Sequence, residues 1–208
     1  MTNHLELNLE EFGKLLVDQL AGRVFIEHER IQLLYKHYLL FSRWNRVMNL
    51  SSIREARKIV QKHYCESLFL GAHLPQGNFS VLDVGSGAGF PGIPVGILRP
   101  ELEITLAESR KKKAAFLKEA SRGLPNVKVY SGRAEELNQK HEWVISRAVG
   151  WPHLKKLVVR LASGIAILAS KKTLEEIFKG NKISWFEPID LPWASESVLV
   201  MGRVPRET

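Results

Sequence analysis

The segment with the most chemical content is a run of three glycines at alternate positions. Gly85, Gly87 and Gly89 follow an apolar run that contains Asp83, and they precede Pro91. Glycine lets the backbone turn sharply and lets a ligand approach without a Cβ in the way. Pro91 suits the first turn of a helix, whose free N–H groups favour an anionic or electron-rich ligand. The segment therefore predicts a small-molecule site between a strand and a helix.

The spacing of the glycines separates two classes of cofactor. Nicotinamide cofactors bind at G-x-G-x-x-G, and the third glycine of that pattern would fall at Phe90. The observed G-x-G-x-G, with Asp83 two residues ahead, resembles the first motif of Rossmann-like methyltransferases that use S-adenosylmethionine. That cofactor carries a carboxylate and an ammonium group, which suit a glycine loop beside an aspartate. A purely structural tight turn is the alternative.

A carboxylate at the end of the next apolar run fits a nucleoside. Glu108 lies 23 residues after Gly85. An acidic side chain at this position can accept hydrogen bonds from both ribose hydroxyls, of NAD or of S-adenosylmethionine alike. The alternative is a surface glutamate paired with Arg110 or Lys111.

Two more polar groups follow later apolar runs. Arg133, Ala134 and Glu135 come after the third run, and Arg147 comes at the end of the fourth. Open α/β sheets bind ligands at the carboxyl ends of their strands, so these residues belong to the candidate site. The alternatives are a capped helix start for the first group and a structural ion pair, to Asp83 or Glu135, for Arg147.

The chain after residue 78 reads as strands alternating with helices, which indicates an α/β fold with a mostly parallel sheet. The expected strands are Val81–Val84, Ile104–Ala107, Val127–Tyr130, Val144–Ser146 and Ile165–Ala169. The expected helices are Gly92–Leu98, Arg110–Arg122 and Pro152–Leu161. Two extended runs, Ile183–Pro188 and Ser197–Val204, predict an antiparallel C-terminal hairpin that closes the sheet.

The chain before this point reads as helical. Apolar residues recur at three- and four-residue spacing over residues 8–72, with Asn8 as a cap and Glu11 three residues on. A turn cluster, Pro75 to Asn78, separates this helical segment from the alternating strands and helices. We therefore expect an N-terminal helical segment, 1–78, and a Rossmann-like S-adenosylmethionine-binding domain, 79–208.

The charge distribution indicates a polyanionic partner. The chain has 30 Lys and Arg against 22 Asp and Glu, a net charge of +8. Residues 36–63 hold 7 basic and 1 acidic side chain, whereas residues 1–35 carry a net charge of −3. Such a basic field is typical of nucleic-acid binding, although a solvated basic surface is the alternative. The candidate RNA-binding residues in this arm are Arg43, Arg46, Arg54 and Arg57.

Aromatic residues are interleaved with these arginines. Trp44 could stack on a splayed base. For Tyr38 and Phe41 we favour core packing, and His63, which lies on an apolar stripe, reads as a core histidine. If the arm carries only a solvated face, the basic stretch from Arg110 to Lys113 is the next candidate RNA surface.

Composition excludes several classes of protein. The chain is 45% hydrophobic, which is too apolar for a mostly disordered chain. No apolar stretch approaches the ~20 residues of a membrane-spanning helix, and no secretory signal is visible. Cys65 is the only cysteine, so we expect neither a disulfide framework nor a thiolate metal site. Together these features predict a cytoplasmic protein.

Five segments in order resemble one family, the bacterial small-subunit (16S) ribosomal RNA guanine-N7 methyltransferase G family, also called glucose-inhibited division protein B. The segments are Trp44–Ser51, His63–Ser67, Asp83–Pro94, Arg133–Glu136 and Val144–Ala148. The resemblance implies a monomeric enzyme that methylates N7 of one guanine in 16S ribosomal RNA and needs no metal.

The resemblance also implies site residues. Cofactor contacts would come from the glycine loop with Asp83 and from the matched positions Gly85, Phe90, Ala134, Glu135 and Arg147, with Glu108 on the ribose. The chain departs from the usual family pattern at a few positions. These are Ser51 for Thr, Glu66 and Glu108 each for Asp, and Gly150–Pro152 for a small apolar stretch.

Methylation of guanine N7 makes modest chemical demands. N7 of neutral guanine carries no proton, so no general base is required, and the sequence offers no obvious catalytic triad. Arg147 is the candidate catalytic residue, because N7 must stay free and a cation can recognise O6 alone. Arg133 could serve the same role. The alternatives are a methyltransferase of this fold acting on a small molecule or a protein, and a non-catalytic RNA-binding module.

Overall fold

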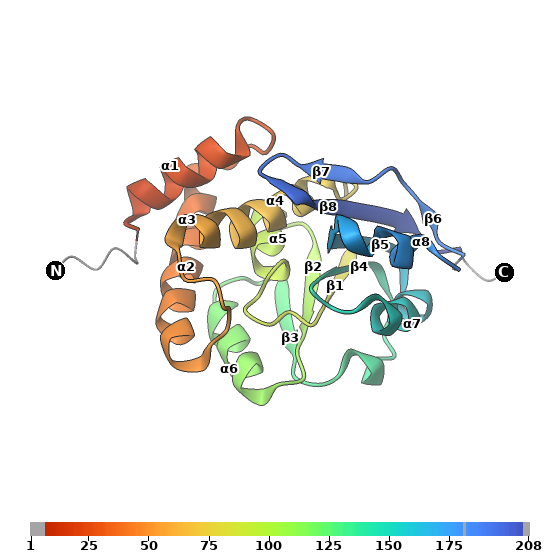
Figure 1. Ribbon diagram of the computed structural model, residues 1–208. Helices are drawn as coiled ribbons and strands as arrows, with labels where there is room; N and C mark the ends of the chain where they lie inside the picture. The colour runs from red at the N-terminus through yellow and green to blue at the C-terminus, as the bar shows by residue number, and fades with distance from the viewer. Residues whose placement is uncertain (1–6, 181, 206–208) are drawn as a thin grey trace.

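A single mixed sheet forms the centre of the computed structural model, which describes residues 7–180 and 182–205 (Figure 1). Five strands are parallel and run in the order β3-β2-β1-β4-β5. Their bounds are Ser80–Val84 for β1, Glu103–Ala107 for β2, Val127–Tyr130 for β3, His141–Arg147 for β4 and Ala162–Ser170 for β5. The strand order reverses between β1 and β4, where open α/β sheets bind their ligands.

The C-terminal strands continue the sheet with the opposite direction. The long strand β8, Ala194–Arg203, pairs antiparallel with β5, and the short strand β6, Ser184–Trp185, pairs antiparallel with β8. The antiparallel closure predicted from the sequence is thus confirmed. A second short strand, β7 (Ile189–Leu191), also pairs with β8 and was not predicted, because three residues are too few to show a periodicity.

Helices connect the strands. α5 spans Gly92–Leu98, α6 spans Lys111–Ala120 and α7 spans Trp151–Leu161, within two residues of the predicted bounds. Short helical turns follow β3 and β5: η2 (Ala134–Glu136), η3 (Lys171–Thr173) and α8 (Leu174–Phe178). The sequence did not predict η3 and α8.

The N-terminal residues form the predicted helices, α1 (Leu9–Leu20) and α2 (His28–Met48), followed by a continuous helical run. That run consists of α3 (Ala56–Ile59), a π-helical turn η1 (Val60–Cys65) and α4 (Glu66–His73). The predicted capping box at Asn8 is present, with both reciprocal hydrogen bonds at 2.9 Å. Asn49, in the left-handed region at φ 48°, ends α2. None of the helices among the described residues is long and apolar enough to cross a membrane.

Two apolar clusters pack against the sheet. The larger contains buried residues of the N-terminal helices, such as Phe12 and Tyr64, together with residues of α5, α6 and the sheet. The smaller contains α7 with β4, β5 and β8. The N-terminal helices therefore share one core with the sheet, and the division of the chain at residue 78 stays a prediction.

Candidate cofactor and substrate site

The glycine loop between β1 and α5 has the backbone geometry that its sequence predicts. Gly85, Gly87 and Gly89 have φ values of +72°, +58° and +84°, a region that side chains with a Cβ rarely adopt. A Cβ on Gly89 would lie 2.5 Å from Cδ1 of Ile93. The loop is therefore tightly packed on its inner side.

A pocket of about 250 Å³ lies over this loop. Its floor is Gly85 to Ala88, and its walls include Ser51 from the loop after α2, Lys113 from α6 and Arg147 from the end of β4. The sheet order explains this assembly, because β1 and β4 are neighbours and their carboxyl ends lie at the same edge. The volume lies below the usual range of about 300–1,000 Å³ for small-molecule sites, so part of a nucleoside cofactor would need side chains to move aside.

Asp83 lies beneath the loop rather than on the pocket surface. Its side chain is fully buried, and Oδ2 accepts a hydrogen bond from the Gly92 N–H at 3.1 Å. Burial raises the pKa of Asp83 to about 7, against the opposing effect of the hydrogen bonds at Ser86 and Gly92. Asp83 thus braces the loop to the start of α5, and its contact with a cofactor stays a prediction.

Glu108 holds the loop from the other side. It is 7% exposed, and its Oε2 accepts from the Gly87 N–H at 3.0 Å while Oε1 accepts from the Arg110 N–H at 2.7 Å. The contact with Arg110 is therefore to the backbone, not an ion pair between side chains. Each carboxylate oxygen can accept a second hydrogen bond, so ribose hydroxyls could still bind here.

Arg147 is held at the end of β4 by the N-terminal helical run. Its guanidinium donates to the carbonyl oxygen of Lys62 and to Nδ1 of His63, the latter at 2.9 Å. The carboxylate recorded beside it is Glu66, at 4.0 Å, rather than Asp83 or Glu135. Burial lowers the pKa of Arg147, and the carboxylates of Glu66 and Asp83 oppose that shift.

The bond from Arg147 fixes the tautomer of His63. A guanidinium can only donate, so Nδ1 accepts and the ring proton is on Nε2, which donates to Oγ of Ser51 at 2.9 Å. Oγ of Ser51 also accepts from the Ile53 N–H at 3.1 Å. Burial, with the guanidinium of Arg147 next, holds the pKa of His63 well below its usual range. The imidazole is therefore neutral near pH 7.

Phe90 is 4% exposed in an aromatic cluster between the loop and the N-terminal helices. Its ring stacks on His63 at 4.7 Å and lies 5.1 Å from the rings of both His37 and Tyr64. The cation of Arg147 lies 5.4 Å from the centre of the Phe90 ring. Phe90 also lines the pocket, so it can both support the loop and touch a ligand.

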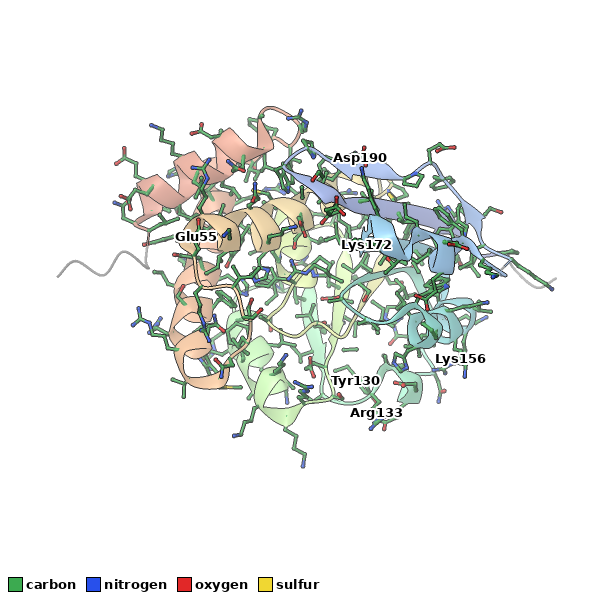
Figure 2. The ribbon with its side chains drawn as sticks, viewed as in Figure 1. Glu55, Tyr130, Arg133, Lys156, Lys172 and Asp190 are labelled. Atoms are coloured by element: carbon green, nitrogen blue, oxygen red, sulfur yellow. The ribbon has the colours of Figure 1, made fainter. Side chains whose placement is uncertain are left out.

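The segment after β3 lies apart from this pocket. Ala134 is buried, and Glu135 is exposed with its carboxylate 3.2 Å from Nε2 of His153 on α7. Arg133 is exposed on the same loop, beside Tyr130 in Figure 2. None of the three lines the pocket over the glycine loop, and their roles stay predictions.

All four candidate arginines of the basic arm, Arg43, Arg46, Arg54 and Arg57, are exposed. Arg54 also donates to the carbonyl oxygen of Asn45 at 3.0 Å and to the side chain of Asn49, which secures the end of α2. Its contact with RNA stays a prediction.

The two basic stretches considered as alternatives lie on neighbouring helices. The ring of Trp44 on α2 lies 5.6 Å from the ring of Phe116 on α6, and α6 begins with Lys111 to Lys113. Tyr38 and Phe41 are fully buried, which confirms the preference for core packing. The α2 part of the basic arm therefore lies beside α6, the helix that begins with these lysines.

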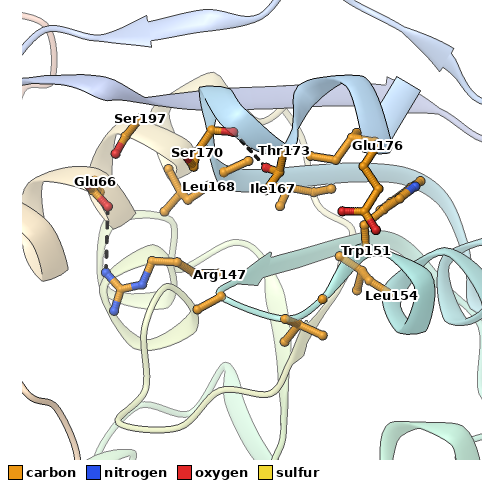
Figure 3. A pocket seen from close by; sticks show the side chains of 15 residues that line it. Glu66, Arg147, Trp151, Leu154, Ile167, Leu168, Ser170, Thr173, Glu176 and Ser197 are labelled. Carbon is orange, nitrogen blue, oxygen red and sulfur yellow. Dashed lines mark hydrogen bonds and ion pairs between the residues drawn. The ribbon is translucent and has the colours of Figure 1, made fainter. Parts of the chain in front are cut away.

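A second, larger pocket of about 430 Å³ adjoins the first (Figure 3). Both pockets include Arg147, Ala148 and Val149 in their walls. The larger one extends along the end of β5 towards η3 and α8, and Glu66 stands at the same end as Arg147.

The sequence did not single out three residues that matter here: His37, Lys113 and, as a pocket residue, Glu66. His37 and Glu66 come from N-terminal helices that only the tertiary fold brings to the sheet. Lys113 sits in a run of lysines, which gave no reason to select one of them. Among the described residues, no group of three or more His, Cys, Asp or Glu could hold a metal ion.

Comparison with solved structures agrees with the fold. A S-adenosylmethionine-dependent methyltransferase from Aquifex aeolicus superposes with a TM-score of 0.58 at 16% identity, covering 71% of this chain and 93% of that one. Magnesium protoporphyrin IX methyltransferase from Synechocystis, solved with bound S-adenosylmethionine, gives 0.57 at 16% identity, covering 87% and 99%. The expectation of a Rossmann-like methyltransferase fold is confirmed.

Curated relatives share more sequence. Ribosomal RNA small subunit methyltransferase G of Nitrosomonas europaea is 44% identical over 119 residues, 55% of each chain. That of Nitrosococcus oceani is 38% identical over 145 residues, 68% of this chain and 64% of the relative. The matched part thus spans less than two thirds of these relatives. The model of the GidB family, described as rRNA small subunit methyltransferase G, matches residues 30–186. Because that match covers well over half of the sequence, the chain belongs to the GidB family.

Proposed function

We propose that this chain transfers a methyl group from S-adenosylmethionine to N7 of a guanine in small-subunit (16S) ribosomal RNA. The observation that carries the proposal is the position of Arg147 at the switch point of the sheet. It lies between a pocket over the glycine loop and a larger pocket, in a member of the GidB family. The pocket over the glycine loop suits the cofactor, and the larger pocket suits a base.

The residues around the glycine loop fit the cofactor. Three loop positions, Gly85, Gly87 and Gly89, carry no Cβ, and Glu108 follows β2 with lone pairs that can still accept hydrogen bonds. When bound, S-adenosylmethionine supplies an electrophilic methyl group on a sulfonium. Glu108 would turn partly from the Gly87 N–H to accept the ribose hydroxyls. Asp83 keeps the loop on α5 throughout.

The chain's own part in the reaction is positioning. The lone pair of guanine N7 needs no base, and His63 is neutral and committed to Arg147 and Ser51. Arg147 would hold O6 while N7 stays free. Correct placement of two reactants can lower a barrier by up to about 7–11 kcal/mol, which is enough to make such a site effective.

Exposed arginines on α2 and α3 and the lysines that open α6 would bind the phosphates of the RNA. We further propose that the protein acts as a monomer, without a metal, in the cytoplasm where ribosomal RNA is assembled. A methyltransferase of the same fold acting on a small molecule or a protein is the competing function.

Labelled methyl transfer separates these functions. The protein is incubated with methyl-labelled S-adenosylmethionine and small ribosomal subunits, and the label is tested for release by nuclease and by protease. Release by nuclease alone supports the proposal. Label that only protease releases, or that passes into small molecules, would refute it.

A further inference from the structure

The larger pocket contains a buried carboxylate with unsatisfied hydrogen-bonding capacity. Glu66 is 4% exposed, and its Oε1 lies 3.2 Å from Nζ of Lys62 in an ion pair that makes no hydrogen bond. Its Oε2 lies 4.0 Å from Nη1 of Arg147, which is beyond hydrogen-bond distance. A buried acceptor left in this state is rare, and a ligand that donates to it is one explanation.

The cation beside it has donors left over. The hydrogen bonds recorded for Arg147 use two of the five N–H groups of its guanidinium, one to Lys62 and one to His63. Figure 3 shows Arg147 and Glu66 at one end of the pocket, with Glu176 at the other. This end of the pocket therefore presents acceptors and donors side by side.

That order of groups matches one nucleobase. The Watson–Crick edge of guanine carries two adjacent donors, N2–H and N1–H, followed by the acceptor O6. A carboxylate can accept from both donors at once, and a guanidinium can donate to O6. Adenine, cytosine and uracil lack two adjacent donors on this edge. The volume of about 430 Å³ lies within the usual range of roughly 300–1,000 Å³ for pockets that take small ligands.

We propose that the pocket between β4, β5 and α8 takes a flipped-out guanine, and that Glu66 selects it by accepting hydrogen bonds from N1–H and N2–H. The proposal rests on the proposed function and adds the residue that chooses the base. With O6 on Arg147, the neighbouring N7 falls at the junction of the two pockets, since Arg147 borders both. Enzymes that modify a base commonly read its Watson–Crick edge in this way.

Burial raises the pKa of Glu66, while Lys62 and Arg147 act in the opposite direction. These two cations keep the carboxylate available as an acceptor although its side chain is buried.

Inosine is the probe, because it keeps N1–H, O6 and N7 of guanine and lacks only the N2 amino group. Binding of guanosine monophosphate and inosine monophosphate is measured with S-adenosylhomocysteine present. Methyl transfer is measured on RNA that carries guanosine or inosine at the methylated position. For the parent, we expect guanosine to be favoured about tenfold or more in both measurements, since one hydrogen bond to a charged group is lost.

Glu66→Gln should lower kcat/KM for guanosine RNA by about tenfold and reduce the guanosine preference to less than about threefold. Glu66→Asp, which keeps two acceptor oxygens, should retain a clear preference. Glu175→Gln, an exposed change on α8, should match the parent. All variants should bind S-adenosylhomocysteine as the parent does, which shows that the fold is intact.

An unchanged preference in Glu66→Gln, or its loss in Glu176→Gln instead, would overturn the inference while leaving the proposed function in place. A guanosine monophosphate preference that depends on Glu66, without methyl transfer to RNA, would support the pocket and refute the proposed function. Equal binding of both nucleotides by the parent would also overturn the inference.

Discussion

At the scale of single residues, burial sets the protonation of the groups that support the glycine loop. His37 is wholly buried, with Nδ1 2.9 Å from the hydroxyl of Tyr64, and burial lowers its pKa to about 4. His63 is neutral for the same reason. Neither imidazole therefore brings a positive charge to the pocket near pH 7, and Arg147 is the cation that the site contributes from β4.

The pKa of His37 predicts a pH-dependent stability. In the unfolded chain the imidazole titrates near 6.5, whereas in the folded protein its pKa is about 4. Between these values the unfolded chain binds a proton that the folded protein does not. The His37 contribution is therefore fully present above pH 6.5 and declines as the pH falls, by up to about 1.4 kcal/mol per pH unit.

His37→Gln removes this titration and can still hydrogen-bond to Tyr64. Urea unfolding of the parent and the variant between pH 4.5 and 7 should give a difference in unfolding free energy that grows with pH at that slope. Taking the difference cancels the other titrating groups, such as Asp83, whose raised pKa acts in the opposite direction. A difference that stays constant over this range would contradict the assignment.

Glu108 predicts an effect on cofactor affinity. If its carboxylate accepts the ribose hydroxyls, Glu108→Ala removes charge-assisted hydrogen bonds worth roughly 1.5–3 kcal/mol each. The Kd for S-adenosylhomocysteine, measured by calorimetry, should rise at least about tenfold. Glu119→Ala, an exposed change on α6, is the control and should leave the Kd as it is. If the Kd of Glu108→Ala equals that of the parent, Glu108 does not bind the ribose and serves only to hold the N–H groups of Gly87 and Arg110.

At the scale of elements, the close approach of α5 to the sheet positions the loop. Gly92 begins α5, and a Cβ there would lie 2.3 Å from Leu106 on β2 and 2.6 Å from Oδ2 of Asp83 on β1. No side chain larger than hydrogen fits between helix and sheet at this point. The glycine therefore allows the contact through which Asp83 braces the loop.

Gly92→Ala should consequently destabilise the protein by about 1–3 kcal/mol, the usual range for overpacking a core. Gly150→Ala is the control, since no atom lies within 4 Å of the added Cβ, and its effect should stay below about 1 kcal/mol. Denaturant unfolding of both variants measures the contrast. Equal stabilities for the two variants would mean that α5 can move away from β1 without loss.

The elements also show which features the sequence could predict. The parallel strands and α5 to α7 were predictable, because continuous apolar runs and helical periodicity are local patterns. The capping box at Asn8 is equally local. The turns after β5 and the strand β7 were not, since they are three to five residues long, too short to show a periodicity.

The site was predictable only in part, for a related reason. The glycine loop, Glu108 and Arg147 could be predicted, because each follows or ends an apolar run that reads as a strand. The partners of Arg147 could not be inferred, because His63 and Glu66 lie some 80 residues away in sequence, on helices whose docking on the sheet no local pattern encodes. Of the two carboxylates considered for Arg147, Asp83 accepts from the Gly92 N–H, and Glu135 lies 3.2 Å from His153.

At the scale of the whole molecule, the N-terminal helices both complete the site and present the basic surface. η1 and α4 bring His63 and Glu66 to the end of β4, while α2, which lies beside α6, and α3 carry exposed arginines. An RNA bound on this side would have its phosphates on the helices and a base near Arg147. Affinity for RNA and affinity for the cofactor should therefore be separable.

Salt dependence measures that separation. Replacing Arg43 and Arg57 by Gln should flatten the log–log dependence of RNA affinity on salt by about 0.7–0.9 per lost phosphate contact. Affinity for S-adenosylhomocysteine should not change. Replacing Lys156 and Lys172, which are exposed on α7 and η3, removes the same charge and should leave the salt slope as it was. A slope that responds equally to both pairs would point to a diffuse field rather than a binding surface.

The most direct test of the account is the chemical identity of the methylated product. Small ribosomal subunits from cells without this methyltransferase are incubated with the protein and S-adenosylmethionine, and the extracted RNA is treated with borohydride and aniline, which cut the chain at 7-methylguanine. The proposed function predicts one new scission in the small-subunit RNA that appears only when protein and cofactor are both present. Methyl incorporation without such a scission, or no incorporation by a protein that binds S-adenosylhomocysteine, would contradict it.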